Sequence, residues 1–420
     1  MRKVQIKAAA TNNNENGLFR DQGYEQILAQ KQVMRANKKN GNGKRSIFFT
    51  GATGFIGGHI AERLMSEGYA GEAFLLARGE KEKINKTLRE KFFLISFGLD
   101  DNYQYQVAHG DVTEESVTNE ILPSKLDAIW HCAGLLSFKQ EDADLDYQVN
   151  VVGTQNMLAL AERCDIEEFH FVSTAYICGT REGVIMENEF DEGQKFNNPY
   201  EATKFEAEKI VSDWGEKHGI PTFIYRPGIV IGDYYTGRAF NFSGYYTMVR
   251  SFLILKKMII RKLQNNGKDL IAQGIRLNGT HLILPVRLPC QLETPINLVT
   301  VNFLTEMIVG IAKKGIPGIY HIVNPNPPSF WELATISFDI MGIKGVRLVG
   351  DVPADLTEVE NMLYQNIFLY FSYLKYNQFF DYTNTKKALG HIPEMPITRS
   401  LLERIIGYAI QSDFGRTQAY

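Results

Sequence analysis

Tyr200 and Lys204 are the residues whose types and spacing suggest chemistry most directly. They lie four positions apart at the head of a predicted helix that continues through Trp214, so both side chains face the same side of it. A tyrosine is a weak acid at its ordinary pKa of about 10, but an ammonium beside it stabilises the phenolate and lowers that pKa. Thr174, at the end of a predicted strand, could share a substrate oxygen with Tyr200, which predicts proton donation to that oxygen. Tyr and Lys are common, so the spacing also arises by chance and needs support from the rest of the chain.

A glycine-rich turn gives that support, because it predicts a nucleotide site in the same molecule. An apolar run, 47–49, precedes three glycines spaced G-x-x-G-x-x-G. Gly51 would allow a tight turn, Gly54 a close approach of backbone N–H groups to a pyrophosphate, and Gly57 close packing of a helix on the strand. A second apolar run, 73–77, completes a βαβ unit. We therefore predict a dinucleotide at a helix N-terminus rather than a purely structural turn.

The residue that follows the second predicted strand distinguishes the two nicotinamide cofactors. An acidic side chain there would bind the ribose 2′-OH, but this chain has Arg78. A guanidinium suits a 2′-phosphate, so the sequence predicts NADPH in preference to NADH. The alternative is an ordinary surface arginine in a loop rich in charge.

The composition is typical of a soluble enzyme. The 420 residues are 44% hydrophobic and 22% charged, with a formal net charge of −3, which gives no indication of nucleic-acid binding. The four cysteines have neither metal-ligand nor disulfide-scaffold spacing, so we expect no metal site and a reducing, cytoplasmic setting. No apolar stretch has the length of a membrane span, and no export signal is expected.

Alternating strand-like and helical stretches indicate the fold class. Between Ile47 and Pro227 they predict an α/β, Rossmann-type doubly wound parallel sheet, with a smaller, mainly C-terminal substrate-binding subdomain. We expect a mobile polar leader at 1–45 with one short helix near 24–34, an NAD(P)-binding domain at 46–233, and a mainly substrate-binding subdomain at 234–420. Residues 295–324 would return to the first domain. The predicted strands are 105–108, 128–131, 168–172 and 222–225.

The order of these features along the chain resembles the extended short-chain dehydrogenase/reductase superfamily, from Ser46 to Ala409. Its motifs are most similar to those of thioester reductases and fatty acyl-CoA reductases, including the terminal reductase domains of carboxylic acid reductases and peptide synthetases. The matching motifs are Thr50-Gly51-Ala52-Thr53-Gly54-Phe55-Ile56-Gly57, Leu76-Ala77-Arg78, Gly110-Asp111-Val112, Asn150-Val151-Val152-Gly153-Thr154, Phe171-Val172-Ser173-Thr174 and Arg226-Pro227-Gly228-Ile229-Val230.

The resemblance implies roles for particular residues. Thr174, Tyr200 and Lys204 would be catalytic, and Lys204 would also bind the cofactor ribose. The cofactor-binding residues would be Gly51, Thr53, Gly54, Phe55, Ile56, Gly57, Arg78, Asp111, Val112, Ala133, Gly134, Asn150, Tyr200, Lys204, Pro227, Gly228 and Val230.

The same resemblance implies the reaction: NADPH-dependent reduction of an acyl thioester, on CoA or on an acyl carrier protein, to an aldehyde or alcohol. One alternative is an extended reductase, epimerase or dehydratase acting on a sterol-like, nucleotide-sugar or other small substrate. A non-catalytic nucleotide-binding scaffold is more remote, because it has no chemical reason to keep Tyr200 and Lys204.

Substrate specificity is expected in the less regular segments. A helix at 246–263 with apolar and basic stripes could cover an acyl tunnel and meet CoA phosphates or an acidic carrier, although an amphipathic core helix is the preferred interpretation. The aromatic tract 363–382 could line a lipid pocket or touch a membrane interface; packing of the subdomain is the simpler expectation.

Overall fold

A seven-stranded parallel sheet forms the centre of the first part of the chain. The computed structural model describes residues 45–96 and 103–416, so the predicted leader and its helix at 24–34 lie outside the described residues. The strand order is β13-β7-β5-β4-β1-β2-β3. The strands are β1 (Arg45–Thr50), β2 (Ala70–Ala77), β3 (Tyr105–His109), β4 (Leu126–His131), β5 (Ile166–Val172), β7 (Thr222–Pro227) and β13 (Gly318–Ile322).

The sheet is buried on both faces, which explains the continuous apolar runs of its strands. Phe48 and Phe49 of β1 point to opposite faces, and both are fully buried. Phe48 pairs in register with Phe74 of β2 and Ile129 of β4. The strand order reverses between β1 and β4, and the crevice at such a point is where open α/β sheets bind ligands.

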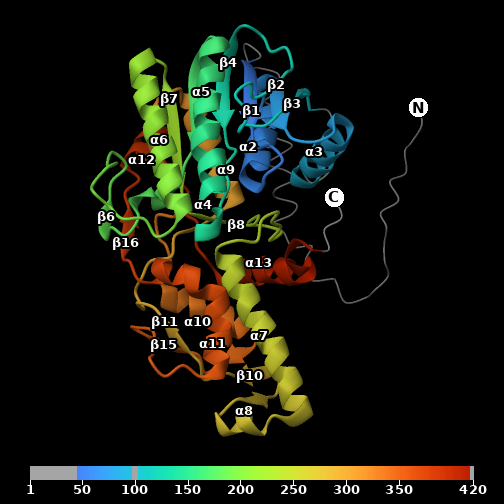
Figure 1. Ribbon diagram of the computed structural model, residues 1–420, viewed down its shortest axis with the longest axis vertical. Helices are drawn as coiled ribbons and strands as arrows, with labels where there is room; N and C mark the ends of the chain where they lie inside the picture. Colours follow the sequence, from blue (N-terminus) through green and yellow to red (C-terminus); the bar gives the residue numbers. More distant parts are fainter. Residues whose placement is uncertain (1–44, 97–102, 417–420) are drawn as a thin grey trace, which may run out of the picture. The chain divides into compact units, whose positions relative to one another are not determined.

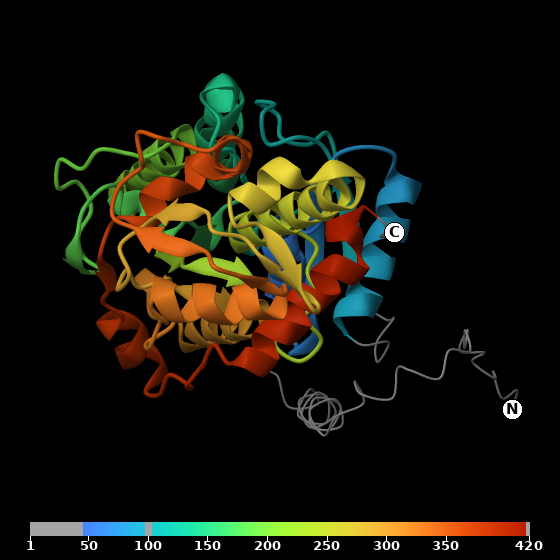
Figure 2. The same cartoon turned by 90° about the horizontal axis from the view of Figure 1, so that it is seen from below.

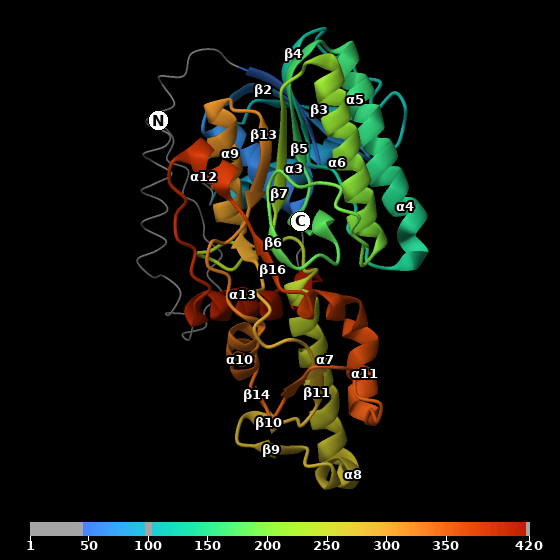
Figure 3. The same ribbon diagram turned by 90° about the vertical axis from the view of Figure 1, so that its left-hand side faces the viewer.

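Helices cover both faces of this sheet. Figure 3 shows α9 and α12 on one face and α5 and α6 on the other. The helices of this part are α2 (Phe55–Ser66), α3 (Lys81–Ile95), α4 (Ala143–Tyr147), α5 (Gly153–Arg163), α6 (Pro199–His218), α9 (Val301–Lys314) and α12 (Thr383–Leu389), with the π-helical η3 (Gln148–Val152) joining α4 to α5.

Helix α6 begins where its sequence predicts. Asn198 is its N-cap, and the Asn198 side chain accepts a hydrogen bond from the Glu201 N–H at 3.0 Å. Pro199 occupies the first turn, and Gly219 ends the helix in the left-handed conformation with φ of +66°. These signals place Tyr200 in the first turn, at the edge of the sheet where the strands end.

Short elements connect the sheet to the rest of the described chain. Among the strand pairs outside the large sheet, β8 with β12 and β6 with β16 are parallel. The short elements are β6 (Gly183–Ile185), β8 (Ile229–Ile231), β12 (Leu298–Thr300), β16 (Gln378–Phe380), η2 (Gln140–Asp142), η4 (Ala175–Cys178) and η6 (Asp413–Gly415).

The second part lies beyond the carboxyl ends of the strands and has its own apolar core (Figure 1). Figure 2 shows α7, in yellow, beside α13, in red. The elements are α7 (Tyr245–Asn266), α8 (Lys268–Ala272), β9 (Arg276–Asn278), β10 (His281–Ile283), β11 (Arg287–Pro289), α10 (Phe330–Ile340), β14 (Ile343–Lys344), β15 (Arg347–Val349), α11 (Glu358–Ile367), η5 (Phe368–Leu374) and α13 (Arg399–Gln411).

The chain crosses between the two parts more than once. Strand β13 belongs to the large sheet and α9 packs against β7 and β13; both elements fall within residues 295–324, which we expect to return to the first domain. Helix α12 also packs on α9 and β13, so residues 383–389 lie with the sheet although we assigned them to the substrate-binding subdomain. The boundary at 233 stays a prediction. Within residues 45–96 and 103–416, no helix combines the length and the apolar character needed to cross a membrane.

Candidate active site

One cavity brings nearly all of the predicted site residues together. Its volume is about 590 Å³, and it extends from the glycine turn along the carboxyl ends of the strands to α7 and α10. All three predicted catalytic residues line it. So does every predicted cofactor-binding residue except Asn150.

The glycine turn has the shape that a dinucleotide pyrophosphate requires. Gly51 has φ of +80°, and a Cβ there would stand 2.8 Å from the Ala133 nitrogen. A Cβ on Gly57 would come within 2.3 Å of the Gly51 carbonyl oxygen. Gly54 is the N-cap of α2 and provides no side-chain cap, so the first N–H groups of the helix are available to an anionic ligand. The residues present therefore fit the cofactor class.

Arg78 and Asp111 both line the cavity, just after the ends of strands β2 and β3. The Arg78 Nη1 lies 3.4 Å from Asp111 Oδ2, and the Arg78 side chain is 75% exposed. Burial opposes ionisation of Asp111, but hydrogen bonds from Thr113 and the guanidinium of Arg78 outweigh it and lower the pKa of Asp111. A loose, exposed ion pair of this kind is weak, which leaves Arg78 able to turn toward a phosphate.

Asn150 is placed differently from our expectation. It is buried in the π-helical turn η3, behind the cavity. Its side chain accepts a hydrogen bond from the Leu135 N–H at 2.8 Å and donates to the Leu135 carbonyl at 3.0 Å. In this structure Asn150 therefore holds the 133–135 turn, which lines the cavity. Single π-helical turns are frequent at functional sites because they redirect one side chain.

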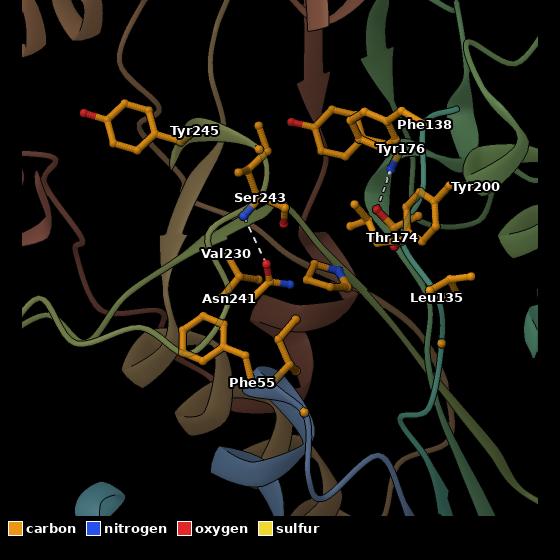
Figure 4. A pocket seen from close by; sticks show the side chains of 18 of the residues that line it. Phe55, Leu135, Phe138, Thr174, Tyr176, Tyr200, Val230, Asn241, Ser243 and Tyr245 are labelled. Carbon is orange, nitrogen blue, oxygen red and sulfur yellow. Dashed lines mark hydrogen bonds between the residues drawn. The ribbon is translucent and has the colours of Figure 1, made fainter. Parts of the chain in front are cut away.

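Thr174 and Tyr200 are adjacent in the cavity, as Figure 4 shows. The Thr174 side chain lies close enough to Tyr200 to act on the pKa of the Tyr200 hydroxyl. The Thr174 Oγ1 also accepts a hydrogen bond from the Tyr176 N–H at 3.3 Å, which fixes its position. Two hydroxyls from different elements thus converge on one point. This is the arrangement that can hold a carbonyl oxygen.

The pKa of Tyr200 differs from our expectation. Burial raises it, and the neighbouring Thr174 hydroxyl only partly offsets this effect. Lys204 does not lower it here, because its ammonium donates to the Val172 carbonyl at 2.7 Å and lies 4.0 Å from the centre of the Phe171 ring. Tyr200 is therefore a protonated donor in this structure. Burial also lowers the pKa of Lys204, to about 8, against the opposing effect of Glu208.

An aromatic group beside the two hydroxyls was not predicted. Phe138 packs against Tyr373, Tyr370 and Tyr200, and Tyr176 packs edge-on to Tyr373. The Tyr373 hydroxyl donates to the carboxylate of Glu201 and accepts from the Asn198 amide at 2.8 Å. Segment η5 thus supports the start of α6. The aromatic tract 363–382 indicated that these side chains pack somewhere, but the sequence did not show that they would pack against the start of α6.

The part of the cavity between α7 and α10, which we call the far arm, is apolar. Helices α7 and α10 face each other there. The Tyr245 hydroxyl and the Ser337 Oγ are 2.8 Å apart and form a hydrogen bond with each other. The remaining lining of the arm consists of Met248, Val249, Phe252, Leu288, Ile296, Leu298, Phe330, Leu333, Ala334, Phe338 and Met341. The helix expected at 246–263 is thus both a core helix and a wall of the cavity.

The parallel sheet, the glycine turn and the convergent hydroxyls define an NAD(P)-dependent oxidoreductase of the extended short-chain dehydrogenase/reductase fold. The family model described as "Male sterility protein", an NAD-binding family, matches residues 49–278, more than half of the chain. The chain belongs to this family. A nicotinamide dinucleotide is accordingly its cofactor class.

Two solved structures are similar over nearly the whole chain. The terminal R domain from the myxalamid PKS-NRPS biosynthetic pathway has a TM-score of 0.66 and 20% identity, covering 93% of this chain and 100% of that one. A thiolation-reductase di-domain from an archaeal non-ribosomal peptide synthetase has a TM-score of 0.61 and 18% identity, covering 93% and 81%. At these identities the likeness shows the fold alone.

Curated relatives cover less of the chain. A linear gramicidin synthase of Brevibacillus parabrevis is 30% identical over 207 residues, which are 46% of this chain and 4% of that protein. Two UDP-glucose 4-epimerases are each 27% identical: that of Caenorhabditis elegans over 40% of this chain and that of Rhizobium meliloti over 46%. The chain spans about half of the length of each.

Proposed function

We propose that this protein reduces an acyl thioester with NADPH to an aldehyde, or onward to an alcohol. The observation that supports it most is that one cavity joins the hydroxyls of Thr174 and Tyr200 to an apolar arm. An acyl chain fits such an arm, because burying each CH₂ group is favourable by about 0.8 kcal/mol. The similarity to reductase domains of peptide synthetases supports the same reaction.

The chemistry follows from the positions of the side chains. When bound, the reduced nicotinamide supplies the hydride that forms the new C–H bond at the carbonyl carbon. Thr174 and Tyr200 stabilise the charge that develops on the carbonyl oxygen, and Tyr200 protonates it. The hemithioacetal then collapses: the carbonyl re-forms, the C–S bond breaks, and the sulfur leaves as a thiol with a proton. One hydride and one proton thus yield one aldehyde and one thiol.

Lys204 lines the cavity together with Thr174 and Tyr200. Its ammonium has three donors, and the Val172 carbonyl accepts one of them. We propose that another binds the cofactor ribose. Burial keeps Tyr200 in its neutral form, so it carries the proton that it would donate.

Arg78 should determine the choice between the two nicotinamide cofactors. We expect Arg78→Ala to weaken NADPH binding by about tenfold or more, since a charge-assisted bidentate contact contributes about 1.5–3 kcal/mol. NADH binding should hardly change. Titration of each dinucleotide by fluorescence measures both constants, and equal losses for the two would contradict the 2′-phosphate assignment.

A nucleotide sugar fits the far arm poorly. Among the described residues that line the arm beyond Tyr245 none is charged, and the Ser337 hydroxyl is already paired. A sugar diphosphate buried there would lose its hydration without replacement hydrogen bonds. The carrier of the acyl group is proposed as CoA or a carrier protein, the latter on the likeness to the thiolation-reductase di-domain.

A substrate panel tests the proposal. Purified protein with NADPH would be offered acyl-CoAs of increasing chain length, an acylated carrier protein and UDP-glucose. We expect dinucleotide oxidation with thioesters only. Turnover of UDP-glucose and silence with every thioester would support the epimerase alternative instead.

A further inference from the structure

Lys91 is a buried lysine that belongs to none of the motifs discussed above. It lies on α3 and is 2% exposed. Its Nζ donates hydrogen bonds to the Thr53 carbonyl and, at 3.1 Å, to the Gly54 carbonyl. The ammonium also lies 5.1 Å from the centre of the Phe240 ring. Thr53 and Gly54 line the main cavity but Lys91 does not; Lys91 lines a second, neighbouring cavity together with Thr53 and Gly54, so it contacts the glycine turn from the other side.

This contact determines where the backbone donors of the turn point. In a trans peptide the carbonyl of one residue and the N–H of the next point in opposite directions, and the described peptides are all trans. With the Gly54 carbonyl directed at Lys91 and at the Gly58 N–H, the Phe55 N–H points away from Lys91. Gly54 is the N-cap of α2, so the Phe55 N–H is one of the unpaired N–H groups at the start of this helix, where Gly54 and Phe55 line the main cavity. Lys91 therefore holds an anion-binding donor in place.

Stability alone does not account for this residue. No carboxylate in residues 45–96 and 103–416 forms an ion pair with Lys91, and burial lowers its pKa to about 8. A buried ammonium without an anionic partner is costly to fold. A doubly charged pyrophosphate on the other face of the same turn would supply the missing negative charge when the cofactor is bound.

We propose that Lys91 is a positioning residue for the dinucleotide, which orients the glycine turn through the Thr53 and Gly54 carbonyls and places a positive charge behind the pyrophosphate. This role needs only the nicotinamide cofactor class and does not depend on the thioester proposal. It also differs from that of Arg78, because the pyrophosphate is common to NADPH and NADH.

Lys91→Met tests the role, since it keeps the length of the side chain and removes the donors and the charge. We expect the Kd of NADPH and of NADH, measured by fluorescence without any acyl substrate, to rise alike by at least about tenfold. Turnover at saturating cofactor should stay within about twofold of the original. Lys86→Met is the matched control, because Lys86 is an exposed lysine of the same helix, and it should leave both constants unchanged.

Unchanged dinucleotide binding in a folded Lys91→Met variant would overturn the proposal, whether or not turnover at saturation falls. If Lys91→Met does not fold, Lys91→Gln replaces it, because glutamine keeps an N–H donor group and removes the charge. The Kd of both dinucleotides should then rise by a smaller factor, and no rise would refute the role.

Discussion

Replacing Tyr200 by phenylalanine should lower kcat for thioester reduction by about 10² to 10⁴-fold while NADPH binds almost normally. The variant removes the hydroxyl that lies beside Thr174 in the cavity but keeps the ring that packs beside Phe138. Little structure is lost, so the effect should fall on the chemical step. Steady-state turnover at saturating cofactor measures the effect on the chemical step, and a separate dinucleotide titration measures the effect on NADPH binding.

Tyr147→Phe is the control for that change. Tyr147 lies on α4 outside the cavity lining, and its hydroxyl donates to Glu206 at 3.3 Å near the surface. Removing this oxygen should leave turnover unchanged. A Tyr200→Phe variant as active as the Tyr147→Phe variant would mean that another group protonates the substrate oxygen.

Filling the apolar arm should change chain-length preference. Ala334 is buried on α10 and lines the arm, so Ala334→Phe would exclude the distal methylenes of a long acyl chain. Excluding three CH₂ groups costs about 2.4 kcal/mol, or roughly 50-fold in kcat/KM for the long substrate. Short acyl-CoAs should be reduced almost as before. This prediction rests on the proposed function.

Thr335→Phe is the matched control, because Thr335 is the next residue of α10 and is exposed. It adds the same ring outside the cavity and should leave the chain-length profile unchanged. Thermal unfolding of both variants separates overpacking from a change in specificity. An identical loss for short and long chains in Ala334→Phe would indicate that the arm does not hold the acyl group.

The parts of the site that depend on local sequence were predictable. The apolar run 47–49 and the glycines indicated the first strand and the start of α2, and the helix that carries Tyr200 and Lys204 followed from the spacing of its residues. Parallel strands end at one edge of a sheet, so the residues after each strand could be expected to converge there. The cavity lining agrees with that expectation.

The parts that depend on distant contacts were not predictable. Glu201 and Tyr373 are 172 residues apart, and no local pattern pairs them. Lys91 in α3 looks like a solvated lysine of a charged helix until the fold brings it behind the turn at 53–54. Asn150 lies in a π-helical turn, which the sequence gives no signal for, and its side chain bonds to the Leu135 backbone.

The most direct test of thioester reduction is the fate of the hydride. Reduced cofactor carrying deuterium at the transferable C4 position would be incubated with an acyl-CoA, and the product and free thiol would be quantified together by mass spectrometry and thiol titration. We predict deuterium on the former carbonyl carbon of the product. We also predict one thiol per NADPH consumed for an aldehyde, or one per two for an alcohol. Deuterium absent from that carbon, or consumption of cofactor without release of thiol, would contradict the proposed reaction.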